Sequence, residues 1–112
     1  MAHKGQQDFI ELVRRQFSDF FANRRVLEIG SLDINGSIRS QFTNCAYTGI
    51  DVAVGPGVDL VCQGQDYGGP DDSFDVVLQL DTLQHLRNTE KMLRETARVG
   101  RVGIVSFPNF AH

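Results

Sequence analysis

Acidic residues and glycines follow the first strongly apolar segment of the chain. The stretch VLEIGSLDINGS, residues 26–37, carries Glu28 ahead of Gly30 and Gly36, with Asp33 between the two glycines. Glycine lets the backbone approach a ligand closely because it has no Cβ atom, and nearby carboxylates favour a cationic ligand. A pyrophosphate would need G-x-G-x-x-G at the start of a helix, and this loop lacks that spacing. We therefore expect the loop to hold a ligand that carries positive charge.

Three later apolar segments also end in groups that can complete a binding site. Asp51 closes the second segment, where a carboxylate can accept hydrogen bonds from ribose hydroxyls. In open α/β sheets, ligands bind at the carboxyl ends of the strands, so these groups are expected to outline one cleft. The third and fourth segments end in Gln63, Gly64, Asp66, Leu80 and Asp81.

The elements that position these groups alternate between helix and strand patterns. Residues 6–22 place apolar side chains at three- and four-residue steps, which predicts a helix. Short helices are predicted at 37–42 and from Asn88 or Thr89 to Gly100. Strands are predicted at residues 24–30, 46–52, 58–63, 74–80 and 101–107, where apolar runs are bounded by turn residues.

This alternation predicts an α/β fold built on an open, mostly parallel, Rossmann-like sheet of about five strands with flanking helices. The short turn AVGPG between the second and third strands leaves no room for a helical crossover. Either these two strands are not parallel neighbours or the helical layer is reduced there, and we favour the reduced layer. The 112 residues suit a single domain, 1–112, with an N-terminal helix in 1–23 and an α/β core in 24–112.

Composition excludes several classes of protein. A formal net charge of −3 gives no electrostatic footprint for nucleic acid, and the pairs Arg14–Arg15 and Arg24–Arg25 are explained by a basic rim. No apolar run approaches the ~18 residues of a membrane span, so we expect a cytoplasmic protein with no membrane partner. Cys45 and Cys62 form no cluster with a histidine at metal-ligand spacing, which favours buried free thiols and no metal.

Taken together, these residues resemble the class I S-adenosylmethionine-dependent methyltransferases. That family has an acid and then glycines after its first strand, as in LEIGS at residues 27–31, and a ribose-binding acid at the end of its second strand, which corresponds to Asp51. The segment DYGGPDDSFDVVLQLDTLQHL, residues 66–86, is similar to the fourth-strand region of the family's small-molecule members. The resemblance spans roughly residues 24–107.

The resemblance implies the strand order 3-2-1-4-5 and S-adenosyl-L-methionine as the cofactor. Two positions depart from the family pattern. The segment SLDIN makes the glycine loop longer than in the family, so Gly36 is expected to be the glycine at the start of the next helix. At the second position, Gln63 stands where the family often has an acid that accepts a hydrogen bond from the adenine amino group. The implied cofactor-binding residues are Glu28, Gly30, Ser31, Gly36, Asp51, Val52, Gln63, Gly64, Gln65 and Leu80.

Several of these residues have a second interpretation. Glu28 either contacts the ligand or caps a neighbouring backbone group, and Asp33 suits a solvated turn better than a cofactor contact. Asp66 either belongs to the site or forms a local turn. Asp81 either belongs to the site or caps the helical turn that follows it. His85 and Asp81 are the candidates for a catalytic base, although His85 also suits a partly buried structural histidine. Asn109 resembles a residue near the family's substrate mouth, and loop polarity explains it equally well.

The function implied is methyl transfer to a small-molecule acceptor that the sequence does not identify. The alternative is a non-catalytic, S-adenosylmethionine-binding module that acts through a partner, and a Rossmann-type oxidoreductase is disfavoured by the glycine loop. The family's C-terminal antiparallel hairpin is expected to be lacking, because the sequence ends shortly after the fifth strand. That strand would then be an exposed edge, which we expect to be covered by the N-terminal helix or by a second copy in a homodimer.

Overall fold

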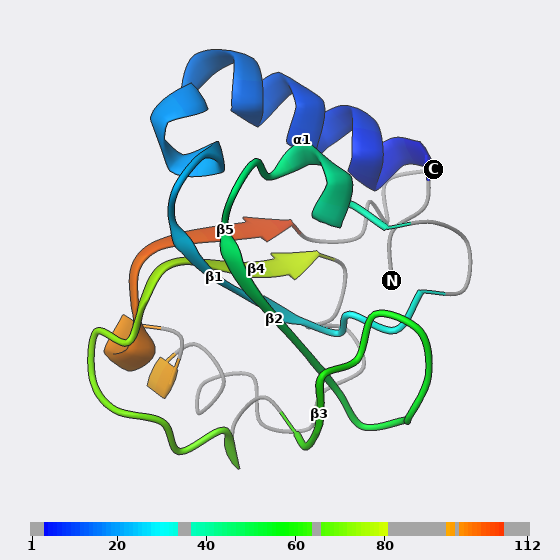
Figure 1. Cartoon of the computed structure of the whole chain (residues 1–112), viewed down its shortest axis with the longest axis vertical. Helices are drawn as coiled ribbons and strands as arrows, with labels where there is room; N and C mark the ends of the chain where they lie inside the picture. Colours follow the sequence, from blue (N-terminus) through cyan, green and yellow to red (C-terminus); the bar gives the residue numbers. More distant parts are fainter. Residues whose placement is uncertain (1–3, 34–36, 64–65, 81–93, 96, 107–112) are drawn as a thin grey trace.

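The computed structural model describes residues 4–33, 37–63, 66–80, 94–95 and 97–106, and they build one five-stranded sheet (Figure 1). The strands are β1 (Arg25–Ile29), β2 (Ala46–Asp51), β3 (Leu60–Val61), β4 (Phe74–Leu80) and β5 (Gly100–Ser106). Their spatial order is β3-β2-β1-β4-β5, and every neighbouring pair is parallel. The predicted Rossmann-like α/β fold and its strand order are therefore confirmed.

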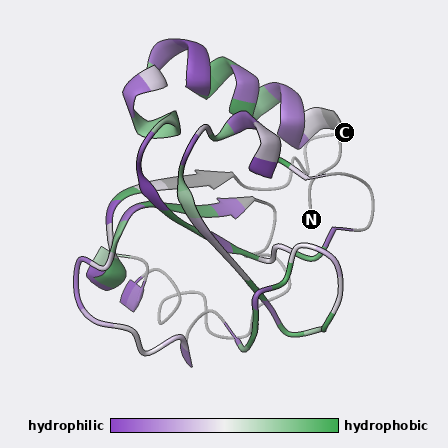
Figure 2. Ribbon diagram, viewed as in Figure 1, coloured by the Kyte–Doolittle hydropathy of each residue, from purple (hydrophilic) through white to green (hydrophobic). Residues whose placement is uncertain are grey.

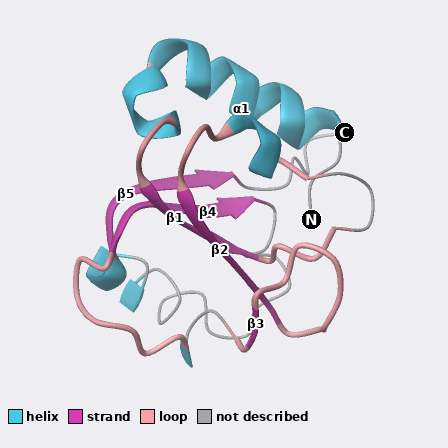
Figure 3. Cartoon of the chain, viewed as in Figure 1, coloured by secondary structure: helices cyan, strands magenta, loops and turns pink. Residues whose placement is uncertain are grey.

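Helical segments cover one face of this sheet, as Figure 3 shows. They are α1 (Lys4–Gln16) and the 3-10 turns η1 (Ser18–Phe21) and η2 (Arg39–Gln41). Hydrophobic and hydrophilic residues alternate along α1 (Figure 2), as expected for a helix that packs on one side only. Within the described residues, no helix is long and apolar enough to span a membrane.

The first helix ends earlier than its apolar pattern predicts. Phe17 has φ −130° and ψ 48°, which is not helical, and η1 follows it. The turn η1 packs against the sheet because its last residue, Phe21, stacks on Phe42, with 4.5 Å between the ring centroids. Packing of these aromatic rings thus overrides the helical periodicity of residues 17–22.

Alternating strand residues build a core on each face of the sheet. Val26 and Leu27, neighbours in β1, are fully buried in different clusters. The cluster beneath α1 contains Ile10, Phe21, Val26, Ile38, Phe42, Val76 and Leu78. The cluster on the opposite face contains Leu27, Ile29, Ile50, Phe74, Val77 and Val99.

The connections around β3 contain little helix. β2 and β3 are parallel neighbours, and residues 52–59 join them without a helix, so the preferred interpretation of a reduced layer is confirmed. After β3, residues 66–73 return toward the start of β4, and the ring of Tyr67 lies 5.7 Å from that of Phe74. Arg98, in a helical stretch, anchors this return through an ion pair of 2.7 Å to Asp71, and it also pairs at 2.7 Å with Glu95, three residues before it.

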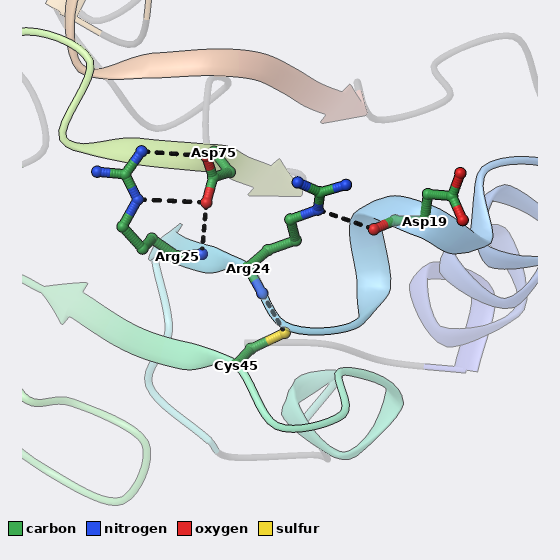
Figure 4. A network of polar contacts seen from close by, with 5 residues as sticks. All are labelled: Asp19, Arg24, Arg25, Cys45 and Asp75. Atoms are coloured by element: carbon green, nitrogen blue, oxygen red, sulfur yellow. Dashed lines mark hydrogen bonds and ion pairs between the residues drawn. The ribbon is translucent and has the colours of Figure 1, made fainter.

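The amino ends of β1 and β4 are tied together by a charged pair (Figure 4). Asp75 accepts three hydrogen bonds from Arg25: one from the backbone nitrogen at 2.9 Å, one from Nε at 3.2 Å and one from Nη2 at 3.0 Å. Arg24 donates through Nε to the carbonyl oxygen of Asp19 at 2.9 Å. The pair Arg24–Arg25 therefore holds the amino end of β1 in place, in addition to forming the basic rim that the sequence indicates.

This pair predicts a loss of stability in acid. The hydrogen bonds from Arg25 lower the pKa of Asp75 to about 2, below the value of about 3.9 for an unfolded chain. The ionised carboxylate therefore stabilises the fold above about pH 4, and this contribution disappears as the pH falls toward 2. Asp75→Asn should lower the free energy of unfolding at pH 7 by about 1 kcal/mol or less, because Arg25 is half exposed to water. Urea unfolding at pH 7 and pH 2.5 tests this, since the difference between the two proteins should shrink at the lower pH.

β5 lies at the end of the sheet opposite β3. It pairs with β4, and among the described residues no strand lies on its other side. Ile10 of α1 belongs to the cluster that contains Val76 and Leu78 of β4, so α1 packs on a face of the sheet. Pairing of the β5 edge with a second copy stays a prediction.

Candidate functional site

Asp51 lies where three strands end, and it joins their loops. Its Oδ2 accepts a hydrogen bond from the backbone nitrogen of Leu32 at 3.0 Å, and its Oδ1 accepts one from Ala53 at 3.2 Å. Its carbonyl oxygen accepts a hydrogen bond from Cys62, just after β3, at 2.8 Å. A carboxylate has about four acceptor positions, so two backbone amides leave it capacity for further donors. Asp51 is thus suited to bind a hydroxylated ligand while it holds the loop that follows β1.

The loops after β1 and β2 pack closely against each other. Asp33 donates through its backbone nitrogen to the carbonyl oxygen of Pro56 at 2.8 Å. Gly57 has φ +82°, and a Cβ atom there would lie 2.7 Å from the carbonyl oxygen of Ser31. On β2, a Cβ atom at Gly49 would meet the Ser31 hydroxyl at 2.5 Å and also the Gly57 carbonyl oxygen. Glycine is therefore required where these two loops meet.

Glu28 is buried beneath this loop pair, with 3% of its surface exposed. It pairs in register with Gly49 and shares a sheet face with Tyr47, whose hydroxyl donates to its Oε1 at 2.6 Å. Burial raises the pKa of Glu28, while the Tyr47 hydrogen bond and the charge of Arg39 oppose that rise. Glu28 was predicted to contact the ligand or to cap a backbone group, and neither role includes the hydrogen bond that it accepts from Tyr47.

Two charged residues extend this contact beyond Tyr47. The guanidinium of Arg39 lies over the Tyr47 ring, 4.6 Å from its centroid, and pairs with Asp59 at 2.7 Å. Asp59 in turn accepts a hydrogen bond from the backbone nitrogen of Gly49 at 2.7 Å. The sequence pattern did not predict Arg39, Tyr47 or Asp59 as site residues. The strand alternation of AYTGID, which puts Tyr47 and Gly49 on one face, is the signal that was available.

The structure brings several of the predicted residues to the same edge of the sheet. Gly30 and Ser31 both donate to the carbonyl oxygen of Ile50, at 2.9 and 3.0 Å, which sets their loop beside Asp51. Val52 follows Asp51 directly and is 66% exposed, which leaves its apolar side chain available to a ligand. Gln63, also exposed, follows Cys62 and accepts a backbone hydrogen bond from Asp66.

The remaining predicted residues have less structural description. Leu80 is the last residue of β4, whose Gln79 pairs in register with Ile29 of β1, so its backbone ends next to the loop after β1. Six other candidates lie outside the described residues: Gly36, Gly64, Gln65, Asp81, His85 and Asn109.

The two cysteines are free thiols, as the sequence predicts, but both are only partly buried rather than buried. Cys45 packs against the cluster beneath α1, whereas Cys62 packs against the cluster on the other face. Burial and the charge of Asp66 raise the pKa of the Cys62 thiol, so it stays protonated and weakly nucleophilic at neutral pH.

Comparison with known proteins adds an independent line of evidence. A family model described as "Methionine biosynthesis protein MetW" matches residues 19–112. The bifunctional methionine biosynthesis protein MetXA/MetW of Rhodopirellula baltica is 44% identical over 59 residues, which is 50% of this chain and 10% of that protein. The chain thus matches about a tenth of the length of this curated relative. The family match begins after α1 and includes all five strands.

Proposed function

The chain belongs to the family described as methionine biosynthesis protein MetW, and we propose that it binds S-adenosylmethionine and transfers its methyl group to a small-molecule acceptor. The observation that carries this proposal is the position of Asp51. Its carboxylate lies at the junction of β1, β2 and β3, beside the Gly30 loop, with acceptor capacity beyond its two backbone bonds. This is the expected position of a ribose-binding acid in an open α/β sheet.

The neighbouring residues suit the other parts of this cofactor. The exposed side chain of Val52 offers an apolar surface to an adenine ring, and Gln63, an exposed residue, carries an amide oxygen of the kind that accepts a hydrogen bond from an amino group. Glu28 places a carboxylate before the glycine loop, which favours a cation there. Acids at these positions would repel a pyrophosphate, so the site suits a sulfonium compound better than a dinucleotide.

The protein's contribution to methyl transfer would be mainly positioning. When bound, S-adenosylmethionine supplies a methyl group on a good leaving group. Asp51 and the glycine loop would fix the ribose and the charged end of the cofactor, and alignment of this kind is worth about 7–11 kcal/mol in favourable cases. A base is needed only when the acceptor must lose a proton, and the candidates His85 and Asp81 lie outside the described residues.

A second function is favoured by the bifunctional relative, whose name joins MetXA and MetW. MetXA/MetW of Rhodopirellula baltica carries both names, so a MetW-like segment can exist physically joined to a MetXA segment. In this alternative, the chain is a non-catalytic, S-adenosylmethionine-binding module in methionine biosynthesis. It would act through a partner similar to MetXA rather than through methyl transfer.

Two measurements separate these functions. Calorimetric titration with S-adenosylmethionine, S-adenosylhomocysteine and NAD should show binding of the first two only, and binding of NAD alone would refute both functions. Incubation with S-adenosylmethionine and a small-molecule extract should then release S-adenosylhomocysteine if the chain is an enzyme. Binding without release, both alone and with a MetXA-type protein added, would support the non-catalytic module.

A further inference from the structure

Tyr47 is enclosed by groups that fix the direction of its hydroxyl. The Tyr47 and Phe42 rings meet edge to face at a centroid distance of 5.4 Å, and Arg39 lies over the face of the Tyr47 ring. Because Asp59 holds both Arg39 and the backbone of Gly49, the ring is secured from η2 and from the segment before β3. This leaves the hydroxyl directed at Glu28, 2.6 Å from Oε1.

The hydrogen bond affects the charge state of Glu28. A carboxylate in an apolar interior favours its neutral form, and burial raises the pKa of Glu28 accordingly. The proton donated by Tyr47 stabilises the ionised form, as does the nearby positive charge of Arg39, whereas Asp33 opposes it. Burial and the charge of Glu28 raise the pKa of Tyr47, so its hydroxyl keeps the proton that it donates.

We propose that Tyr47 is a positioning residue that makes the ligand site selective for positive charge. By donating to Glu28, it opposes the effect of burial and favours the ionised carboxylate two residues before Gly30, where the ligand loop begins. A sulfonium ligand then gains an attraction that a neutral thioether of nearly the same shape does not. The inference rests on the proposed binding of S-adenosylmethionine and assigns charge selectivity to residues outside the glycine loop.

The test compares two ligands that differ by one methyl group and one positive charge. Dissociation constants for S-adenosylmethionine and S-adenosylhomocysteine are measured by calorimetry on the wild type and on Tyr47→Phe. The variant should bind S-adenosylmethionine about tenfold more weakly, the scale of a hydrogen bond to a charged group, and S-adenosylhomocysteine about as well as the wild type. A general loosening of the fold would weaken both ligands equally, so the ratio of the two constants separates positioning from structure.

The chain offers a matched control because it contains two tyrosines. Tyr67 packs against Phe74 on the opposite face of the sheet, and Tyr67→Phe should leave the ratio unchanged. Glu28→Gln, which removes the charge directly, should reproduce the loss of selectivity, and Tyr47→Phe should add little to it in the double variant.

The outcomes distinguish this inference from the proposed function. If the wild type binds neither ligand, the proposed function fails and the inference fails with it. If the wild type binds both but Tyr47→Phe and Glu28→Gln keep the wild-type ratio, the proposed function stands and the role of Tyr47 is overturned. A changed ratio in both variants, with Tyr67→Phe unchanged, supports the inference even if one of the two variants is less stable.

Discussion

Replacing Asp51 with alanine should weaken the binding of S-adenosylmethionine by at least about tenfold, or about 1.4 kcal/mol. The carboxylate is the group best placed to accept both ribose hydroxyls, since it lies where β1, β2 and β3 end. Calorimetric titration of the folded variant measures the effect directly. An affinity equal to that of the wild type would remove Asp51 from the site.

Asp51 also organises the protein, so its two roles need a control. Asp51 accepts hydrogen bonds from Leu32 and Ala53, and Asp51→Ala leaves both backbone amides without that acceptor. Asp51→Asn keeps a side-chain oxygen for one of these two amides and replaces the oxygen that accepts from the other with a donor. If Asp51→Asn unfolds at the wild-type temperature yet binds the cofactor as weakly as Asp51→Ala, the loss comes from the ligand contact. Wild-type affinity in Asp51→Asn would instead assign the effect to the loops.

A single methyl group at Gly49 should destabilise the fold by about 1–3 kcal/mol, the usual cost of overpacking. The added Cβ atom would meet the Ser31 hydroxyl and the Gly57 carbonyl oxygen, both closer than van der Waals contact allows. These neighbours belong to the paired loops above the sheet, so relief of the clash must shift the ligand loop. Urea unfolding of Gly49→Ala measures the loss, and cofactor titration shows whether the loop has moved.

A control on the same strand separates this clash from a general effect on β2. Ala46, at the start of β2, is exposed, and Ala46→Val adds carbon atoms there toward solvent. It should change the free energy of unfolding by no more than about 0.5 kcal/mol. Equal stability of Gly49→Ala and the wild type would show that the loops separate without cost, contrary to the close packing described above.

The sheet was predictable because buried parallel strands leave a simple signal. Continuous apolar runs such as FDVVLQL can satisfy their backbone only by pairing on both sides, and the turn residues between them set their limits. The position of Asp51 was predictable for a related reason, since the residue at the carboxyl end of a parallel strand lies at the ligand-binding edge of the sheet whatever the side-chain packing.

The surroundings of Glu28 were not predictable in the same way. The contacts of Tyr47, Arg39 and Asp59 depend on strand register and on how loops fold back, which no local pattern encodes. The early end of α1 has a similar cause, because the stacking of Phe21 on Phe42 joins segments far apart in the sequence. Local spacing thus indicated which residues close the strands, whereas the partners of buried polar groups required the tertiary structure.

The place of β1 between β2 and β4 has a consequence for how the chain acquires its structure. β1 gains its second neighbour only by pairing with β4, whose Asp75 lies 50 positions after Arg25. Closing a loop of this length costs conformational entropy before the contacts that offset that cost have formed. A topology of this kind therefore folds more slowly than a helical bundle of equal length. During synthesis, β1 lacks one of its neighbours until β4 has left the ribosome, and an unpaired strand edge of this kind is prone to aggregation.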